Sequence, residues 1–262
     1  MKLDEIDKRM RVFETAHDHR VMPGIFIVVR VDGRNFTRLT RETHRFEAPF
    51  DVRFRDYMIA TLEHLMNCGF RVVYGYTQSD EISLLLHQDE ETFGRKTRKL
   101  ESILAGEASA RFSLALGDVA VFDARVSQLP SLDLVVAYFR WRSQDAHRNA
   151  LNGHCYWALR NQGRTAREAT DSLLGLSVAA KNEFRFQVKH VNFNDVPRWQ
   201  KAGVGLTWED YDKAAVNPLT GETSTATRRR IHRHFDLPIE DEYSEFVRGV
   251  VVRSVSTVPE GQ

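Results

Sequence analysis

The chain has 262 residues, of which 42% are hydrophobic and 28% charged, and a formal net charge of +1. This composition is that of a globular protein with a sizeable core, and no apolar run reaches the roughly 20 residues of a membrane span. A net charge near zero excludes a strong general attraction to polyanions, so a nucleic-acid site would need local clusters of basic residues. With only Cys68 and Cys155 and no leader-like N-terminus, we expect reduced thiols and a cytoplasmic protein.

The first half of the sequence predicts a short helix followed by the order strand, helix, strand, strand, helix, strand. The helix, at residues 3–14, is indicated by the helical spacing of its apolar residues, and we expect it to pack on the sheet or on another subunit. The later elements are expected at residues 25–31 (strand), 51–67 (helix), 72–86 (two strands joined by a turn), 91–116 (helix) and 119–126 (strand). This βαββαβ order is typical of ferredoxin-like domains, in which the first and third strands lie side by side.

The second half is predominantly helical by pattern. Helices are expected at residues 132–149, 151–159 and 165–174, strands at 203–208 and 250–255, and a turn or loop at 192–197. The predicted class is therefore α+β, with a ferredoxin-like, palm-like catalytic domain at residues 1–130 and a mostly helical C-terminal region at residues 131–262. Because no linker separates them, we expect the two parts to form one continuous structural unit.

Acidic residues end two of the predicted strands. Asp32 follows the first apolar run, and Asp80 and Glu81 lie in the turn of the predicted hairpin. An unpaired buried carboxylate is costly, so these side chains are expected at strand ends, where a cation can reach them. Together with the carbonyl of Gly33, they offer the oxygen ligands that Mg²⁺ prefers. The palm domains of nucleotide polymerases and cyclases have such a sheet, and the fold alone does not choose between them.

Four separated motifs carry a resemblance to a known family: residues 31–36 (VDGRNF), 78–83 (QSDEIS), 122–126 (FDARV) and 138–149 (YFRWRSQDAHRN). In order and approximate spacing they resemble the tRNA-His guanylyltransferase family. Two further motifs of that family, Asp-Lys-Asn-Glu and Asn-Tyr-Asn, are similar to residues 181–183 (KNE) and 192–194 (NFN). The resemblance implies a Mg²⁺-dependent nucleotidyltransferase that adds nucleotides to the 5′ end of tRNA in the 3′-to-5′ direction. It also implies ATP and GTP as substrates and a homotetramer.

By this resemblance, Asp32, the carbonyl of Gly33 and Asp80 would hold two Mg²⁺ ions. Glu81 would support the carboxylate geometry, and its interpretation as a surface charge beside the site stays equally open. The predicted nucleotide-binding residues are Gly33, Arg34, Asn35, Phe36, Thr37, Ser79, Lys96 and Lys99. The backbone of residues 33–36 would bind a triphosphate, as amide-rich turns do for anions. Lys96 and Lys99 match family positions that contact phosphate, and the alternative is a solvated helix face.

The predicted tRNA-binding residues are His147, Asn149, Lys181, Asn182, Asn192, Asn194, Arg228, Arg229 and Arg230. The histidine, the lysine and the asparagines match family motifs, and the three arginines begin the densest basic run in the chain. A lone histidine is more often structural, and a basic run is often only a solvated segment. The tryptophans are expected mostly in the core, although stacking on a base stays open.

Several positions depart from the eukaryotic members of the family. Those enzymes carry a lysine and an asparagine around a proline, where this chain has Ala48-Pro49-Phe50-Asp51, so a phosphate-contacting cation is absent at Ala48. Such departures are similar to the bacterial and archaeal Thg1-like branch, which commonly repairs truncated tRNAs by template-dependent 5′ addition. Single-guanosine addition to tRNA-His and 5′-end repair therefore both stay open. The alternative functions are a noncatalytic tRNA-binding protein and a palm-type cyclase or 5′-to-3′ polymerase.

Overall fold

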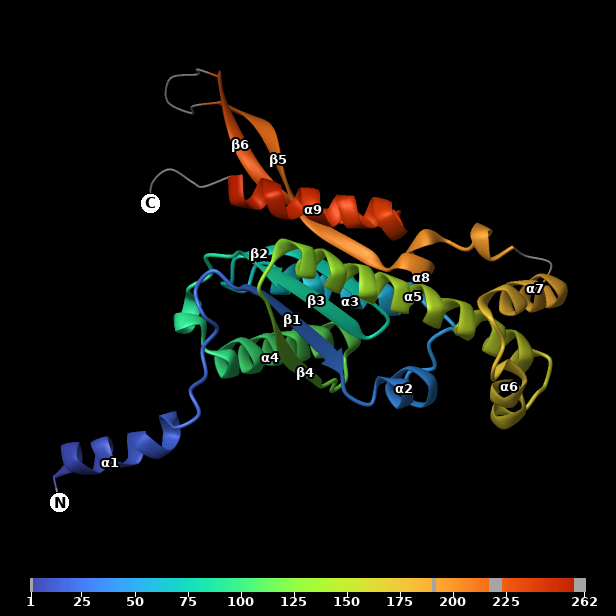
Figure 1. Ribbon diagram of the computed structural model, residues 1–262, viewed down its shortest axis with the longest axis horizontal. Helices are drawn as coiled ribbons and strands as arrows, with labels where there is room; N and C mark the ends of the chain where they lie inside the picture. Colours follow the sequence, from blue (N-terminus) through green and yellow to red (C-terminus); the bar gives the residue numbers. More distant parts are fainter. Residues whose placement is uncertain (1, 190–191, 217–222, 257–262) are drawn as a thin grey trace.

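The centre of the molecule is a six-stranded antiparallel sheet with the strand order β4-β1-β3-β2-β5-β6. The computed structural model describes residues 2–189, 192–216 and 223–256. Its strands are β1 (Phe26–Gly33), β2 (Val72–Gln78), β3 (Glu81–Leu86), β4 (Phe122–Leu129), β5 (Val204–Val216) and β6 (Thr223–His234). The first and third strands are neighbours (Figure 1), which confirms the predicted βαββαβ arrangement and the α+β class.

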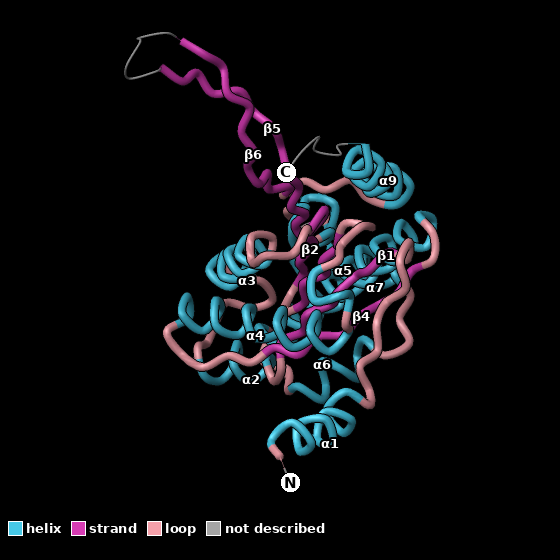
Figure 2. The backbone as a smooth tube through the Cα atoms, turned by 90° about the vertical axis from the view of Figure 1, so that its left-hand side faces the viewer, coloured by secondary structure: helices cyan, strands magenta, loops and turns pink. Residues whose placement is uncertain are grey.

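Helices cover both faces of the sheet. On one face lie α3 (Val52–Leu65) and α4 (Thr97–Leu116), and on the other α5 (Leu132–Asn161) and α9 (Glu240–Ser256), as Figure 2 shows. Residues alternate along β1 accordingly: Val29 and Val31 belong to the core under α3 and α4, and Val28 to the core under α5 and α9. Because both faces are buried, the central strands are apolar almost throughout, and apart from Arg30 charge is confined to their ends.

In the first half, two predicted boundaries are wrong. The helix expected at 91–116 begins only at Thr97, after a 3₁₀ turn at Thr92–Arg95. The reason is the buried Arg95 side chain, which donates hydrogen bonds to the carbonyls of five residues: Val21, Met22, Ile25, Gln88 and Glu90. The strand expected at 119–126 begins at Phe122, because the N–H of Ala120 bonds to Ser113 Oγ, 2.9 Å away, instead of to a strand.

The second half is helical as predicted, with three corrections. The two helices expected at 132–159 are the single helix α5, since neither a proline nor a cap interrupts it. The strand expected at 250–255 lies within α9, where Val247, Val250 and Val251 recur at helical spacing and pack on the sheet. The strand expected at 203–208 is confirmed as the start of β5. Its partner β6 was not predicted, and Figure 1 shows this hairpin projecting from the body.

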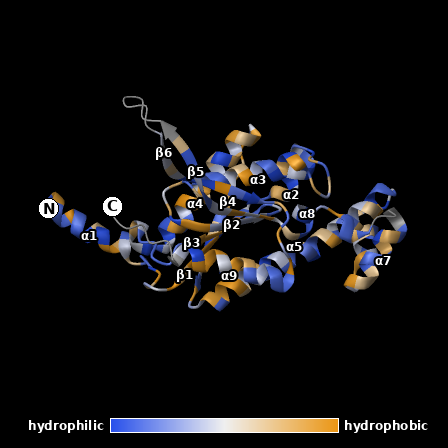
Figure 3. Ribbon diagram, turned by 90° about the horizontal axis from the view of Figure 1, so that it is seen from above, coloured by the Kyte–Doolittle hydropathy of each residue, from blue (hydrophilic) through white to orange (hydrophobic). Residues whose placement is uncertain are grey.

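The remaining helices are α1 (Leu3–Thr15), α2 (Phe36–Arg38), α6 (Ala166–Leu173), α7 (Val178–Lys189) and α8 (Arg198–Ala202). A π-helical turn, η1 (Leu39–Thr43), continues α2, and a 3₁₀ turn, η3 (Phe193–Asp195), precedes α8. Within the described ranges, no helix is both long and apolar enough to cross a membrane. The helix α1 has no buried residue and lies away from the sheet in Figures 1 and 3, so packing of α1 on its own sheet is excluded.

We predict opposite effects for two substitutions of glycine by alanine. A Cβ on Gly75 in β2 would lie 2.5 Å from Cδ1 of the fully buried Leu62. Gly75→Ala should therefore lower the free energy of unfolding by about 1–3 kcal/mol, the usual cost of overpacking. A Cβ on Gly106 in α4 has no neighbouring atom within 4 Å. Gly106→Ala should raise the free energy of unfolding by about 0.5–1 kcal/mol. Urea unfolding measures both, and a Gly75→Ala variant as stable as wild type would contradict this packing.

A second prediction concerns His154, whose ring lies against Phe50 and Phe193 and whose Nε2 is 2.9 Å from Gln200 Oε1. Burial, with a smaller effect of Arg185, lowers the pKa of His154 from 6.5 to about 4. Between these values the unfolded chain binds a proton and the folded chain does not, so stability falls as the pH is lowered. Between pH 7 and pH 4, the free energy of unfolding of His154→Gln should therefore fall by about 2 kcal/mol less than that of wild type. This figure is discounted for solvent screening. Identical pH dependence of urea unfolding in the variant and wild type would contradict this.

Candidate active site

The predicted carboxylates meet at one end of the sheet. Asp32 lies opposite Glu81 in the β1–β3 pairing and opposite Asp123 in the β1–β4 pairing. The N–H of Gly33 donates a hydrogen bond of 3.0 Å to the carbonyl of Asp80. This backbone bond joins the end of β1 to the β2–β3 turn, so Asp32 and Asp80 are brought together as the sequence predicted.

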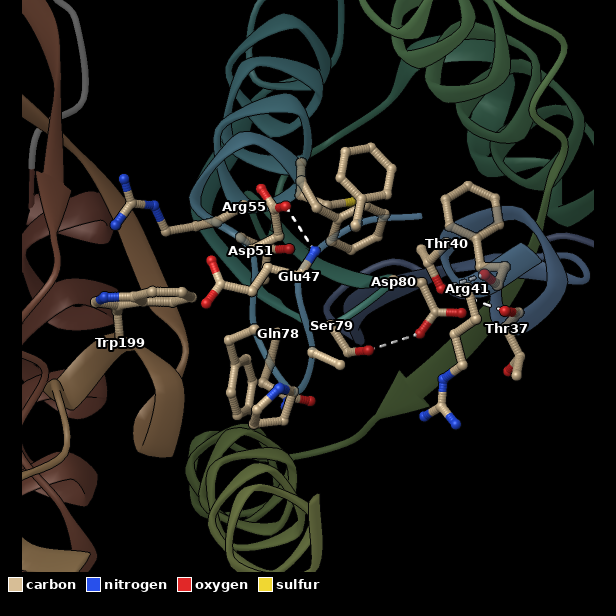
Figure 4. A pocket seen from close by; sticks show the side chains of 18 of the residues that line it. Thr37, Thr40, Arg41, Glu47, Asp51, Arg55, Gln78, Ser79, Asp80 and Trp199 are labelled. Atoms are coloured by element: carbon tan, nitrogen blue, oxygen red, sulfur yellow. Dashed lines mark hydrogen bonds between the residues drawn. The ribbon is translucent and has the colours of Figure 1, made fainter. Parts of the chain in front are cut away.

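The hairpin turn presents Asp80 to a cavity. Ser79 has a positive φ of 54°, and its hydroxyl donates to Asp80 Oδ1 at 3.0 Å. The Thr77 hydroxyl donates to the carbonyl of Glu81 at 2.9 Å, which closes the turn. Figure 4 shows the Asp80 carboxylate beside Ser79, Thr37, Thr40 and Arg41. The turn therefore fixes Asp80, and Ser79 supports it directly.

The electrostatics of this end of the sheet favour a cation. Burial raises the pKa of Asp80, and the nearby charge of Asp32 raises it further. Burial also raises the pKa of Glu81, against the opposing effect of Arg142 and Arg30. A cation between such carboxylates would relieve both their mutual repulsion and the loss of solvation. Groups perturbed in this way are typical of functional sites.

Two arginines hold Glu81, the half-buried Arg30 and the buried Arg142. Arg30 lies 3.6 Å from a carboxylate oxygen of Glu81 and 3.8 Å from Asp32. On the opposite side, Arg142 of α5 lies 3.3 Å from the other oxygen of Glu81 and 2.6 Å from Asp145. Because both oxygens of Glu81 face arginines, the structure favours a supporting role for this residue over that of an exposed surface charge.

The donor set fits a hard divalent cation. Magnesium is usually bound by one or two carboxylates and by phosphates of the substrate, which is what Asp32, Asp80 and the carbonyl of Gly33 would allow. The Asp32 side chain is 33% exposed, so an ion can reach it. A side chain on Gly33 would place its Cβ 2.5 Å from the ring of Phe36, so the close approach of backbone here requires glycine. Among the described residues, no group of three or more His, Cys, Asp or Glu side chains is arranged to hold a metal ion, so an ion bound here would also need the Gly33 carbonyl and substrate phosphates.

The predicted phosphate-binding segment, residues 33–36, directly follows Asp32 in the chain. Arg34 and Asn35 are exposed, and Asn35, in the left-handed region with φ 60°, begins α2. Phe36 is buried against Phe112 and Phe122 and anchors this turn. The N–H groups of Phe36 and Thr37 belong to the first helical turn, where N–H groups lack an acceptor within the helix and favour anions.

Two adjoining cavities open beside Asp80. At one end of the first lie Trp199 and Phe50, whose ring centroids are 5.8 Å apart, and at the other lie Thr37, Thr40 and Asp80. The second is more polar, and Glu81, Asp145 and Asn149 line it. Seven residues line both: Arg41, Pro49, Phe50, Gln78, Ser79, Asp80 and Trp157. Sequence analysis did not single out Arg41, and it expected Trp157 and Trp199 mostly in the core. Nothing local marks these residues, because three distant segments bring them together.

Two of the predicted nucleotide-binding residues, Lys96 and Lys99, lie away from the aspartates. Lys96 precedes the first residue of α4 and forms an ion pair of 2.5 Å with Asp18. Lys99 has its Nζ 5.7 Å from the ring centroid of Phe93. The opposite end of α4 is the one that adjoins β4 and Asp32, as the bond from the N–H of Phe122 to Ser109 Oγ shows. Within one chain, the structure does not bring Lys96 and Lys99 to the aspartates.

The predicted tRNA ligands fall into three groups. Asn149 faces the second cavity and donates to Asp145 at 3.3 Å, whereas His147 packs against Phe193 and burial lowers its pKa. Lys181 and Asn182 lie on α7, which packs against α5, and the exposed Asn192 and Asn194 lie in or beside η3. Only Asn149 of these six adjoins the carboxylates through a cavity.

The third group, Arg228, Arg229 and Arg230, is exposed on β6 in the projecting hairpin. Their charge is partly compensated by the neighbouring strand. Arg230 donates to Glu209 at 2.9 Å, and the guanidinium of Arg229 lies 4.3 Å from the ring centroid of Trp208. The three arginines thus form a basic edge of the hairpin, separate from the cavities.

Comparison with known proteins agrees with this geometry. Residues 7–134 match the family model described as tRNAHis guanylyltransferase, and residues 133–248 match the model described as the Thg1 C terminal domain. The chain is 30% identical to the probable tRNA(His) guanylyltransferase of Mus musculus over 80% of this chain and 75% of that protein. It is 32% identical to the tRNA(His) guanylyltransferase of Debaryomyces hansenii over 77% of this chain and 81% of that protein.

Solved structures show the same likeness. A bacterial tRNA(His) guanylyltransferase (Thg1)-like protein in complex with GTP has a TM-score of 0.70 and 27% identity, over 94% of this chain and 99% of that one. The tRNA(His) guanylyltransferase of Saccharomyces cerevisiae has a TM-score of 0.69 and 25% identity, over 75% of this chain and 91% of that one. With both family models matched in order and relatives aligned along most of their length, the chain belongs to the tRNA(His) guanylyltransferase family.

Proposed function

We propose that this chain is a Mg²⁺-dependent nucleotidyltransferase that adds nucleotides to the 5′ end of tRNA, using ATP and GTP or other nucleoside triphosphates. The observation that carries the proposal is the meeting of Asp32 and Asp80 through the 3.0 Å bond between Gly33 and Asp80, beside two cavities. Family membership supports the reaction class, and a bacterial Thg1-like relative is known in complex with GTP and in complex with ATP.

In this reaction, the 3′ oxygen of the incoming nucleotide forms a bond to the phosphorus at the activated 5′ end. The bond to the leaving group breaks, which releases pyrophosphate from a triphosphate end or AMP from an end activated with ATP, and the hydroxyl proton passes to solvent. Asp32, the Gly33 carbonyl and Asp80 would hold two Mg²⁺ ions, which neutralise phosphate charge and favour ionisation of the attacking hydroxyl. Glu81, held by Arg30 and Arg142, keeps the turn in register.

The two cavities suit two substrates. The aromatic end of the first cavity provides stacking surfaces for a base, and the turn at Asn35–Thr37 provides backbone N–H groups for phosphates. The polar second cavity, with Asn149 on its wall, would take the end of the tRNA. The basic residues of α7 and β6, which lie outside the cavities, would contact more distant parts of the RNA.

We further propose that the chain repairs truncated 5′ ends by template-dependent addition. The support is the departure from the eukaryotic pattern at Ala48 and Phe50, both of which line the first cavity. The structural likeness also extends over more of this chain for the bacterial Thg1-like protein, 94%, than for the yeast enzyme, 75%. Strict addition of one guanosine to tRNA-His is the alternative.

A homotetramer is proposed as the working assembly. Leu3, Ile6, Met10 and Phe13 follow one another at intervals of three, four and three residues, the spacing of a coiled-coil seam. None of them is buried within the chain. We propose that this face of α1 pairs with a second copy of the chain.

We propose a cytoplasmic location. Both cysteines, Cys68 and Cys155, are free thiols, as is usual in reducing compartments.

A third prediction concerns the reaction. Labelled GTP, ATP and Mg²⁺ are incubated with full-length tRNA-His and with a tRNA that lacks its first 5′ nucleotide, and the labelled end is mapped. We expect template-matched 5′ label and a preference for the truncated tRNA. Preference for full-length tRNA-His would support single-guanosine addition instead. Label at a 3′ end, or a cyclic nucleotide product, would indicate a different palm chemistry, and binding without turnover would indicate a noncatalytic tRNA-binding protein.

The same assay tests the carboxylates. Asp32→Asn and Asp80→Asn should each lower the rate by at least about 100-fold, since even residues that only support metal ligands cost about 10- to 100-fold. Asp89→Asn is the matched control, because Asp89 is 79% exposed and lies beyond the opposite end of β3. Activity of Asp80→Asn equal to that of the control would rule out the proposed site.

A further prediction concerns α1. Ile6→Glu combined with Met10→Glu places charges on the proposed seam and should reduce the assembly observed by sedimentation velocity. Lys8→Glu combined with Thr15→Glu is the control, because these residues lie on the opposite side of a heptad seam. An unchanged sedimentation coefficient in the seam variant would exclude α1 from the interface.

A further inference from the structure

An arginine side chain, Arg41, lies at the junction of the two cavities. Arg41, in η1, and Trp157, in α5, both line both cavities. The guanidinium carbon of Arg41 lies 5.2 Å from the ring centroid of Trp157, a cation–π distance. Figure 4 shows Arg41 on the Asp80 side of the cavity, near Thr37 and Thr40. The arginine is thus held next to the carboxylates by an aromatic ring.

Arg41 differs in this respect from the other arginines near the carboxylates. Arg30, Arg125 and Arg142 each lie within 4.0 Å of two carboxylates. Arg55, which also lines the first cavity, pairs with Asp56 at 2.8 Å and lies over Trp199. Arg41 forms no ion pair with any carboxylate of the described chain. Its charge is therefore available to a ligand in the cavities.

We infer that Arg41 binds the triphosphate of the incoming nucleotide. The inference rests on the proposed function and names a substrate-binding residue for it. A guanidinium that lies over an indole ring can still direct the N–H groups of its edge toward a ligand, and this planar edge matches phosphate oxygens in a bidentate pair. The aromatic ring adds attraction without neutralising the charge, as a carboxylate would.

The shape of the first cavity also favours a nucleotide that lies with its phosphates toward Arg41. Its aromatic end, with Phe50 and Trp199, suits a base, and its other end holds Asp80, Thr37 and Arg41. A nucleotide with its base at the aromatic end has its phosphates at the end where Arg41 lies.

Binding measurements separate this role from packing. We compare wild type, Arg41→Gln and Arg38→Gln by isothermal titration with Mg²⁺ present, using GTP, inorganic tripolyphosphate and guanosine. Arg38 is the matched control, since it lies on the same helical segment, is 80% exposed and pairs with Glu42 at 3.6 Å. A lost charge-assisted pair should raise the Kd of Arg41→Gln for GTP and tripolyphosphate about 10- to 100-fold and leave that for guanosine unchanged. Arg38→Gln should bind all three like wild type.

A rescue variant tests the position of the charge. Ala48 lines the same cavity, so Arg41→Gln combined with Ala48→Lys restores a cation to it. Recovery of GTP affinity in this double variant supports phosphate binding, because packing on Trp157 is not restored. Equal Kd values for GTP in Arg41→Gln and wild type would overturn the assignment, as would an equal loss for guanosine. A wild type that neither binds GTP nor labels a 5′ end would instead refute the proposed function.

Discussion

The hydrogen bond from the N–H of Gly33 to the carbonyl of Asp80 is the interaction on which the site depends. It is made by backbone groups, so its position follows from the pairing register of β1 and β3 and not from any catalytic side chain. That register is fixed by burial on both faces, since a slip of one residue would turn Val29 and Val31 away from the core under α3 and α4. The same slip would carry Asp32 to the opposite face from Glu81. Packing of the sheet therefore determines where the carboxylates lie.

Bringing these carboxylates together has an electrostatic cost, and α5 offsets part of it. Arg142 crosses from α5 to Glu81, and Arg30 reaches both Glu81 and Asp32 from within the sheet. The compensation is incomplete, because Arg30 Nε is buried without a hydrogen-bond partner in the described chain, and Arg142 Nε, although 3.3 Å from Glu81, is not aligned for a hydrogen bond. A buried polar group left without a hydrogen bond costs about 1–3 kcal/mol. The helix α5 is thus part of the site and not only a cover for the sheet.

The sequence predicts the centre of the fold well, and its limits have physical causes. Apolar runs that end in Asp32 and Asp80 specify buried strands with charged ends, which is enough to bring the two residues together. By contrast, β6 consists largely of exposed polar and basic residues, and only its pairing with β5 makes it a strand. Residues 250–255 have the β-branched composition of a strand, yet tertiary packing of α9 overrides it. Lys96 and Lys99 match their motif, but their distance from the aspartates depends on the direction of α4.

The cavities were beyond sequence reasoning because a cavity belongs to no single segment. Arg41, Trp157 and Trp199 come from η1, α5 and α8, and only the packing of these three elements brings them to the cavity that Asp80 also lines. Asp80 lies on the wall that the two cavities share, together with Arg41 and Trp157. A transfer between two substrates requires both reacting ends at one point, and holding them there removes much of the entropic barrier. A shared wall that carries the Asp80 carboxylate and, in Arg41, a cation without an ion-pair partner in the described chain meets this requirement for substrates that both end in phosphate.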